Sequence, residues 1–225
     1  MRPTTAALLA LSLTLAGCSN SGTEPPSTPE LVSAAALDKA LLSQDEIDTI
    51  MGTTGMTAHR RVEAMADHRN LLPNLNCLGI WQVNEAGVYG QDGWSALRQE
   101  LLRSPDADDW QNLVVQSAVN YPSQEAARIF FNESADRWSK CTNHNVNITL
   151  NGQRLPKWRS GDLSTTADRL AIPFTRENPA GSDSCQRVLS VSDNVIVDVQ
   201  ACKRDGSRGR QASAIADRIE ANLAQ

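Results

Sequence analysis

Apolar side chains recur at helical spacing in two long stretches of the chain. In the first, which begins after Pro122-Ser123, these positions are Ala127, Phe130, Phe131, Ser134, Trp138 and Cys141. In the second, over residues 211–223, they are Ala212, Ile215, Ala216, Ile219 and Leu223. A single apolar stripe on an otherwise polar helix faces a core. Both stretches therefore predict amphipathic core helices, the first of which ends near Cys141.

Local signals predict two shorter helices earlier in the chain. Ser43 and Glu46 have the spacing of a capping box, and Gly52 is placed to end a helix that runs to about Met51. Residues 77–88 are expected to form the other helix, with Trp81 facing inward.

Runs rich in strand-forming residues lie between these helices. Residues 95–103 and 112–121 are predicted strands, and residues 163–175 are expected to hold a further strand that Pro173 interrupts. Helices and strands are grouped along the chain rather than strictly alternating. This grouping predicts an α+β fold, with an antiparallel β-sheet flanked by helices in a single domain.

Two hairpins are predicted in the second half of the chain. Asn151-Gly152, the strongest short turn signal, joins residues 147–150 to residues 153–158. A two-residue turn at Asp193-Asn194 joins the next pair of strands and places Cys185 opposite Cys202. By alternation from the turn, this is a non-hydrogen-bonded pair, in which the side chains come close enough for a disulfide.

The first residues of the chain resemble a secretory signal that ends in a lipidation site. Arg2 precedes an apolar run over residues 6–15, which is too short for a bilayer that needs roughly twenty residues. Leu15-Ala16-Gly17-Cys18 resembles a bacterial lipobox, which implies that Cys18 is diacylated and becomes the new N-terminus. The alternative is an ordinary signal peptide with a coincidental cysteine.

The sequence thus predicts three segments. Residues 1–17 are the lipoprotein signal peptide, residues 18–36 are the lipidated cysteine and a flexible tether, and residues 37–225 are the folded domain. That length suffices for one core. We expect the mature protein at the cell membrane, lipid-anchored on its extracytoplasmic face.

Charge and composition argue against nucleic acid and anionic membrane surfaces as partners. The formal net charge is −5, and the sequence contains no block of Lys and Arg. Nucleic acid and anionic membrane surfaces are therefore poor candidates. The local group Arg204, Arg208 and Arg210 is interpreted as a solvated loop.

Four cysteines remain once Cys18 is assigned to the lipid. An even number in an exported protein suggests disulfides. The hairpin pairs Cys185 with Cys202, and Cys77–Cys141 then follows by elimination.

No catalytic or metal-binding motif stands out. Cys141 and His144 have the spacing of half a zinc site, but a disulfide cysteine beside a surface histidine is the simpler interpretation. The aspartates at 106, 108 and 109 lack the glycine and distant glutamate of a calcium loop. No nucleophile elbow or phosphate-binding glycine loop is present. We expect no catalytic residue, no metal and no cofactor.

The tryptophans are the candidates for contact with a ligand. Trp81 and Trp138 are expected in the core. Trp94, Trp110 and Trp158 lie near loops or strand ends, where lining of a binding cleft and burial in the core are about equally plausible.

Several short segments, in this order, resemble the PknH-like extracellular domain family. They are Leu41-Leu42-Ser43, Ile50-Met51-Gly52, Cys77 ahead of Tyr89, Val115-Gln116-Ser117-Ala118-Val119, Tyr121-Pro122-Ser123, Trp138-Ser139-Lys140-Cys141, Cys185, Asn194-Val195-Ile196-Val197-Asp198-Val199 and Cys202. In that family the domain is the sensor end of a mycobacterial membrane Ser/Thr kinase, and it also occurs on stand-alone lipoproteins. The resemblance implies the same two disulfides and a large cleft for an unidentified ligand.

Three functions are weighed from the sequence. The first is a non-catalytic sensor-like domain that takes up a small-molecule or envelope-derived ligand in a cleft. The second is an accessory protein that docks onto a membrane protein partner, such as a receptor Ser/Thr kinase. The third is a hydrolase with an unrecognised site. The absence of a recognisable catalytic motif favours the first.

Overall fold

The computed structural model describes residues 31–178, 181–206 and 209–225 of the 225-residue chain. Over these residues one nine-stranded sheet has the order β1-β2-β3-β11-β10-β9-β7-β4, and β8 also pairs with β9. Neighbouring strands are antiparallel, as predicted. Its strands are β1 (Thr57–Ala58), β2 (Ala96–Ser104), β3 (Asn112–Asn120), β4 (Asn145–Val146), β7 (Trp158–Ser160), β8 (Ser164–Thr165), β9 (Arg169–Asn178), β10 (Gly181–Ser192) and β11 (Val195–Lys203).

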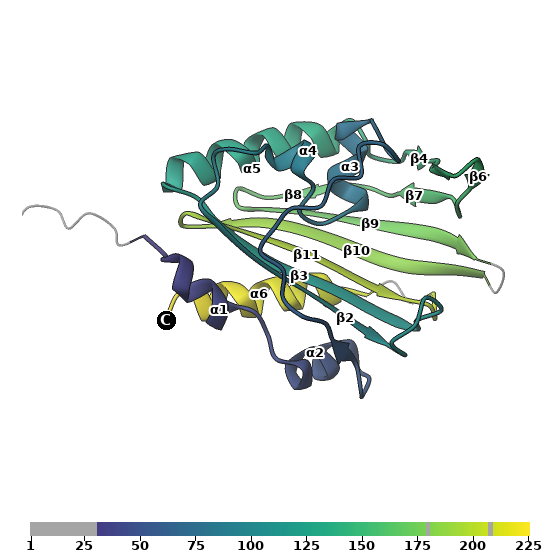
Figure 1. Cartoon of the computed structure of the whole chain (residues 1–225), viewed down its shortest axis with the longest axis horizontal. Coiled ribbons are helices and arrows are strands. Elements are labelled where there is room, and N and C mark those ends of the chain that lie inside the picture. The colour runs from purple at the N-terminus through teal and green to yellow at the C-terminus, as the bar shows by residue number, and fades with distance from the viewer. Residues whose placement is uncertain (1–30, 179–180, 207–208) are drawn as a thin grey trace, which may run out of the picture. The chain divides into compact units, whose positions relative to one another are not determined.

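Helices cover both faces of this sheet (Figure 1). Those on one side, the α5 face, are α3 (Leu75–Trp81), α4 (Ala86–Tyr89) and α5 (Gln124–Ser139). Those on the other side, the α6 face, are α1 (Leu37–Ala40), α2 (Gln44–Met51) and α6 (Gln211–Leu223), with a 3-10 turn at Ala34–Ala36. Within the described residues, no helix is both long and apolar enough to cross a membrane.

Each face has its own apolar core. On the α5 face, Phe130 and Trp138 pack with Leu97, Val119 and other residues of the sheet. On the α6 face, the helices bury a second cluster against alternate residues of the same strands, including Val195, Val197 and Val199 of β11. Alternation of side chains along each strand therefore supplies both cores.

The periodic helices agree with their predictions. In α5, Ser123 caps the first turn through a hydrogen bond to the Ala126 amide, and the predicted stripe is buried. The predicted stripe of α6 is buried as well. The Ser43–Glu46 capping box starts α2, and Gly52 ends it in the left-handed conformation.

The helix predicted over residues 77–88 is wrong in its middle. The chain leaves the helix after Trp81 and re-enters it at Ala86, and between them Asn84 has a φ of 54°. The break frees the last carbonyls of α3 to accept hydrogen bonds from Arg187 of β10. That interaction is tertiary, so local periodicity could not reveal it.

The sequence led us to expect that Pro173 interrupts its strand, but it does not. It lies inside β9, between Ala171, which pairs with β8, and Phe174, which pairs with β7. A proline is tolerated there because the edge partner changes at this point, while the Pro173 carbonyl accepts a hydrogen bond from Gly161.

The hairpin around Asn151-Gly152 is shorter than predicted. Its strands are β5 (Thr149–Leu150) and β6 (Gln153–Arg154), with positive φ at both turn residues. Trp158 belongs instead to β7, which pairs with β4 and β9.

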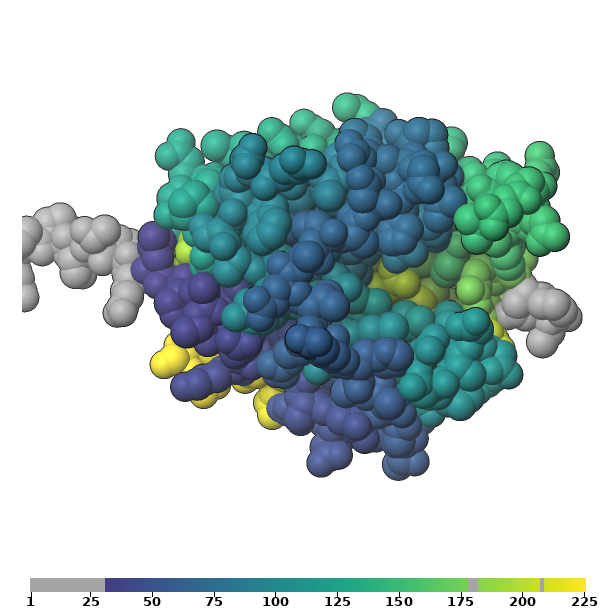
Figure 2. Space-filling view, in the orientation of Figure 1, coloured from purple at the N-terminus to yellow at the C-terminus, as the bar shows by residue number. Residues whose placement is uncertain are grey.

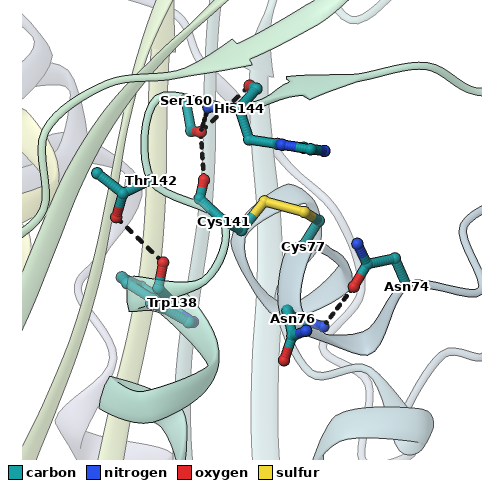
Figure 3. Close-up of a disulfide and its surroundings, with 8 residues drawn as sticks. All are labelled: Asn74, Asn76, Cys77, Trp138, Cys141, Thr142, His144 and Ser160. Atoms are coloured by element: carbon teal, nitrogen blue, oxygen red, sulfur yellow. Dashed lines mark hydrogen bonds between the residues drawn. A yellow bond between two sulfur atoms is a disulfide. The ribbon is translucent and has the colours of Figure 1, made fainter.

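Both disulfides have the predicted pairing. Cys77 of α3 is bonded to Cys141, just after α5, and ties these helices together (Figure 3). Cys185 of β10 lies opposite Cys202 of β11, with Cα atoms 4.0 Å apart. This short separation is typical of a non-hydrogen-bonded antiparallel pair.

Candidate functional site

Helices cover only part of the α5 face. Leu97 and Val119, at the end of the sheet near α5, are 1% and 0% exposed. Further along the same face of β2 and β3, Leu101, Val115 and Leu113 are partly exposed. Figure 2 shows a hollow at this place, between the α3 region and the β2–β3 hairpin, with atoms in the colour of β10 and β11 at its floor. We call this area the open half of the α5 face.

A buried ion pair marks the border between the covered and the open half. The side chains of Arg187 and Asp198 are each 1% exposed and form a direct salt bridge. The Arg187 guanidinium also donates to the carbonyls of Gly79, Ile80 and Gln82, at 2.9–3.2 Å. A buried cation therefore finishes α3 and attaches it to the sheet.

Two neighbours complete the hydrogen bonds of Asp198. The Tyr89 hydroxyl donates to Asp198 Oδ2 at 2.9 Å, and the backbone N–H of Asn84 donates to the same oxygen at 3.4 Å. Burial, and then the charge of Asp198, raise the pKa of Tyr89 well above its ordinary value. The phenol therefore stays protonated and remains a donor to Asp198.

Two of the three candidate tryptophans come together at the far end of the open half. The Arg176 guanidinium carbon lies 5.0 Å from the ring centre of Trp110 and 5.3 Å from that of Trp158. Arg204 lies 5.4 Å from the Trp110 ring, and Asp183 forms ion pairs with both arginines. We call these five residues the tryptophan–arginine cluster, which adjoins the Cys185–Cys202 disulfide.

Trp94 does not take part in this site. Its indole N–H lies 3.4 Å from the Gly90 carbonyl, and its ring packs against the apolar core under α5. Trp94, which the sequence grouped with Trp110 and Trp158, therefore lies apart from them. Sequence reasoning also missed Arg176. It lies two residues after Phe174 on β9, and this spacing places both side chains on the same face of the sheet.

Gln200 carries an unsatisfied polar group. It lies on β11 between Asp198 and Cys202 and points to the same face as both. Gln200 is 7% exposed, and its amide oxygen has no hydrogen-bond partner among the described residues. Buried acceptors are normally satisfied, but this oxygen has less than 1 Å² of exposed surface and is therefore not part of the surface of the hollow.

A second hollow lies on the α6 face, between α2 and α6. It has a volume of about 680 Å³, and its lining includes Ile50, Ala214 and Ala221 beside Asp45 and Asp217. The Arg218–Glu46 ion pair, at 3.5 Å, joins the two helices there. No tryptophan lines this hollow, so it is the weaker candidate for an aromatic binding site.

The remaining sequence candidates have structural roles. Cys141 is in a disulfide, and the His144 ring points away from it (Figure 3). The Ser160 hydroxyl is held by the Cys141 carbonyl and the His144 amide. Asp106 pairs with Arg103 and His59, and these hydrogen bonds hold its pKa below the usual range.

Comparison with known proteins identifies the domain. A model of the PknH-like extracellular domain family matches residues 32–222. Serine/threonine-protein kinase PknH of Mycobacterium tuberculosis is 28% identical over 198 residues, which are 87% of this chain and 31% of the kinase. The kinase of the same name from Mycobacterium bovis is also 28% identical, over 87% of this chain and 33% of the kinase. The chain thus spans about a third of the length of these relatives.

The fold agrees with this match. The crystal structure of the extracellular domain of PknH from Mycobacterium tuberculosis superposes with a TM-score of 0.78 at 28% identity, and covers 87% of this chain and 98% of that domain. The kinase name refers to the full-length relatives, whereas the similarity lies in their extracellular part. The chain therefore belongs to the PknH-like extracellular domain family, whose members are extracytoplasmic domains.

Proposed function

We propose that this domain binds a small, partly apolar ligand from the cell envelope in the open half of the α5 face, and that it catalyses no reaction. The observation that carries the proposal is the loss of helical cover at Leu101, Leu113 and Val115, which leaves partly exposed aliphatic side chains on β2 and β3 beside the hollow. Small-molecule sites are mostly apolar hollows with a few polar groups that fix the ligand.

The tryptophan–arginine cluster supplies suitable chemistry at one end of this area. Trp110 is 6% exposed and is held in place by Arg176 and Arg204, so its ring is positioned before any ligand arrives. A ligand with an apolar body fits these groups.

Two buried polar side chains near the site favour binding over turnover. The Ser160 hydroxyl is 2% exposed as a residue and donates to a backbone carbonyl, which leaves it no access to a substrate. The Asp198 carboxylate is neutralised by Arg187. Neither group is arranged as an activated nucleophile or a free base.

The anchor is part of the proposal and rests on the sequence alone, because Cys18 lies outside the described residues. Lipidation at Cys18 would hold an extracytoplasmic domain where envelope molecules are found. We expect the native protein in the detergent phase of a Triton X-114 partition, and the Cys18→Ala protein in the aqueous phase or unprocessed. A wild-type protein wholly in the aqueous phase would refute the anchor.

A matched pair of variants tests the site. Val115→Trp fills the open half of the α5 face, whereas Ile50→Trp fills the hollow on the α6 face. Residues 31–225 form one compact unit. This segment is stripped of any co-purified lipid and screened against envelope extract fractions by thermal shift. A ligand at 100 times its dissociation constant adds about 2.7 kcal/mol to the free energy of unfolding.

The proposal predicts that an active fraction stabilises wild type and Ile50→Trp but not Val115→Trp. If the ligand fails to stabilise only the Ile50→Trp variant, the binding site lies on the α6 face instead. If no fraction shifts the melting temperature while a purified membrane protein does, docking onto a partner such as a receptor kinase is the better account.

A further inference from the structure

Most lysine and arginine side chains of the described residues form ion pairs, and four of those without an ion pair lie together at the end of the sheet (Figure 1). They are Lys140, Arg154, Lys157 and Arg159, which we call the basic end. Each is exposed, and among the described residues none has an ion pair, a side-chain hydrogen bond or a ring contact. Their charge is therefore not neutralised within the domain.

The fold brings Lys140 close to a short segment, residues 154–159, that holds the other three cations. Lys140 follows α5, and the chain then forms β4, where Asn145 pairs with Arg159 of β7. Arg154 lies on the β5–β6 hairpin, opposite Thr149. Figure 1 shows β4, β6 and β7 together at the end of the sheet opposite α1. No block of basic residues is visible in the sequence because the cations are spaced along it.

Acidic residues do little to compensate the basic end. From position 140 to 162 the sequence contains one acidic residue, Asp162, and its carboxylate accepts a hydrogen bond from Asn143. Glu177, whose amide bonds to the Lys157 carbonyl, is the other acid close by in the backbone pairing. A chain of net charge −5 thus presents a locally positive surface.

The arrangement favours an extended ligand over a small anion. Arg159 lines a hollow of about 400 Å³ with Asn143 and Asp162, but the other three cations do not line it. Along an extended chain, Arg154 and Arg159 are separated by about 17 Å. Leu150, at the tip of the hairpin, is 41% exposed and adds an apolar contact. Cations spaced along the chain from β6 to β7 can neutralise successive charges of a polymer.

We propose that the basic end binds a linear anionic polysaccharide of the cell envelope. The choice of a polysaccharide over a lipid surface rests on charge. A protein of net charge −5 is repelled by an extended anionic membrane surface, whereas a single linear chain can contact the basic end alone. The proposed anchor at Cys18 would keep the domain among the polymers of the envelope.

Charged side chains at sheet edges also have a purely protective role, since they prevent pairing with other edges. That role requires no affinity for a polyanion. Binding to a defined polymer, and its location on the surface, therefore distinguish the two explanations.

The test measures the affinity of residues 31–225 for polygalacturonate by calorimetry at several salt concentrations. Neutral dextran and phosphatidylglycerol vesicles are the comparison ligands. One triple variant is Arg154→Gln, Lys157→Gln and Arg159→Gln. The control triple, Lys39→Gln, Arg60→Gln and Arg210→Gln, removes the same charge from three other exposed cations, which form no ion pair within the part of the chain that the structure describes.

We expect polygalacturonate binding that weakens with salt, a loss of about tenfold or more in the first triple, and little change in the control. Equal affinities of the two triples, whether both reduced or both unchanged, would overturn the proposal, as would vesicle binding without polymer binding. The Val115→Trp variant should bind the polymer normally. A failure of the proposed ligand site in the hollow can therefore be distinguished from a failure of the proposed polymer site at the basic end.

Discussion

The two faces of the sheet are stabilised in different ways. The α6 face is closed by a continuous apolar cluster between β11 and helices α1, α2 and α6. The α5 face combines a smaller helical cover with a buried ion pair, both disulfides and partly exposed aliphatic side chains on β2 and β3. On the α6 face, apolar burial is joined by buried hydrogen bonds between the Gln116 side chain and the Leu42 backbone. On the α5 face, where the helical cover ends, an ion pair and disulfides add to apolar burial, and the candidate site lies there.

Breaking the buried ion pair should have the largest effect on this difference. Asp198→Ala leaves Arg187 charged and buried without its partner, which we expect to cost about 3–5 kcal/mol. The matched variant on the α6 face is Asp217→Ala, which removes a 63% exposed partner of Arg169. For that surface pair we expect at most about 1 kcal/mol. Urea unfolding of both variants measures the contrast, and similar costs would contradict it.

Removing the disulfides should increase the difference in stability between the two faces, because both bridges lie on the α5 face. Loop-closure entropy predicts losses of about 4 kcal/mol for Cys77–Cys141 and about 3 kcal/mol for Cys185–Cys202. The loops that they close differ in length, with sequence separations of 64 and 17. Double Cys→Ala variants give the values. In the reduced protein, amides of α5 should exchange faster relative to those of α6, and uniform acceleration of both would argue against separate faces.

Two identical substitutions on β3 test where the cover ends. Val119 is 0% exposed and Val115 is partly exposed, and both side chains point to the α5 face. We expect Val119→Ala to cost about 2 kcal/mol, because it removes two buried methyl groups and leaves a cavity. We expect Val115→Ala to cost less than about 1 kcal/mol. Equal losses on denaturant unfolding would show that Val115 is covered as well.

The capping box of α2 provides the smallest and most local test, on the α6 face. Ser43→Ala should cost about 1 kcal/mol. The backbone amide and hydroxyl of Ser43 lower the pKa of Glu46, so their stabilisation is complete above the ordinary carboxyl pKa and is lost as the pH falls through the lowered value. The difference between wild type and variant should therefore shrink in acid, and a difference that grows there would contradict this account.

The sequence predicted the elements that depend on local patterns. Stripes at helical spacing located α5 and α6, and the turn at Asp193-Asn194 set the register that joins Cys185 to Cys202. The break at Asn84 was missed because it depends on hydrogen bonds from Arg187, which is distant in sequence.

The site was predicted only in part for the same reason. Trp110 and Trp158 lie together because β9 brings Arg176 between them, whereas Trp94 has an equally loop-like sequence context and packs elsewhere. The basic end depends on the pairing of β4 with β7, two strands too short to be predicted from alternation.

Hydrogen exchange with an active envelope fraction tests the central claim most directly. With ligand bound, we expect slower amide exchange around Leu101, Val115 and Trp110, and unchanged exchange in α2 and α6. Protection confined to α2 and α6, or no protection on β2 and β3 despite a thermal shift, would contradict binding in the open half of the α5 face.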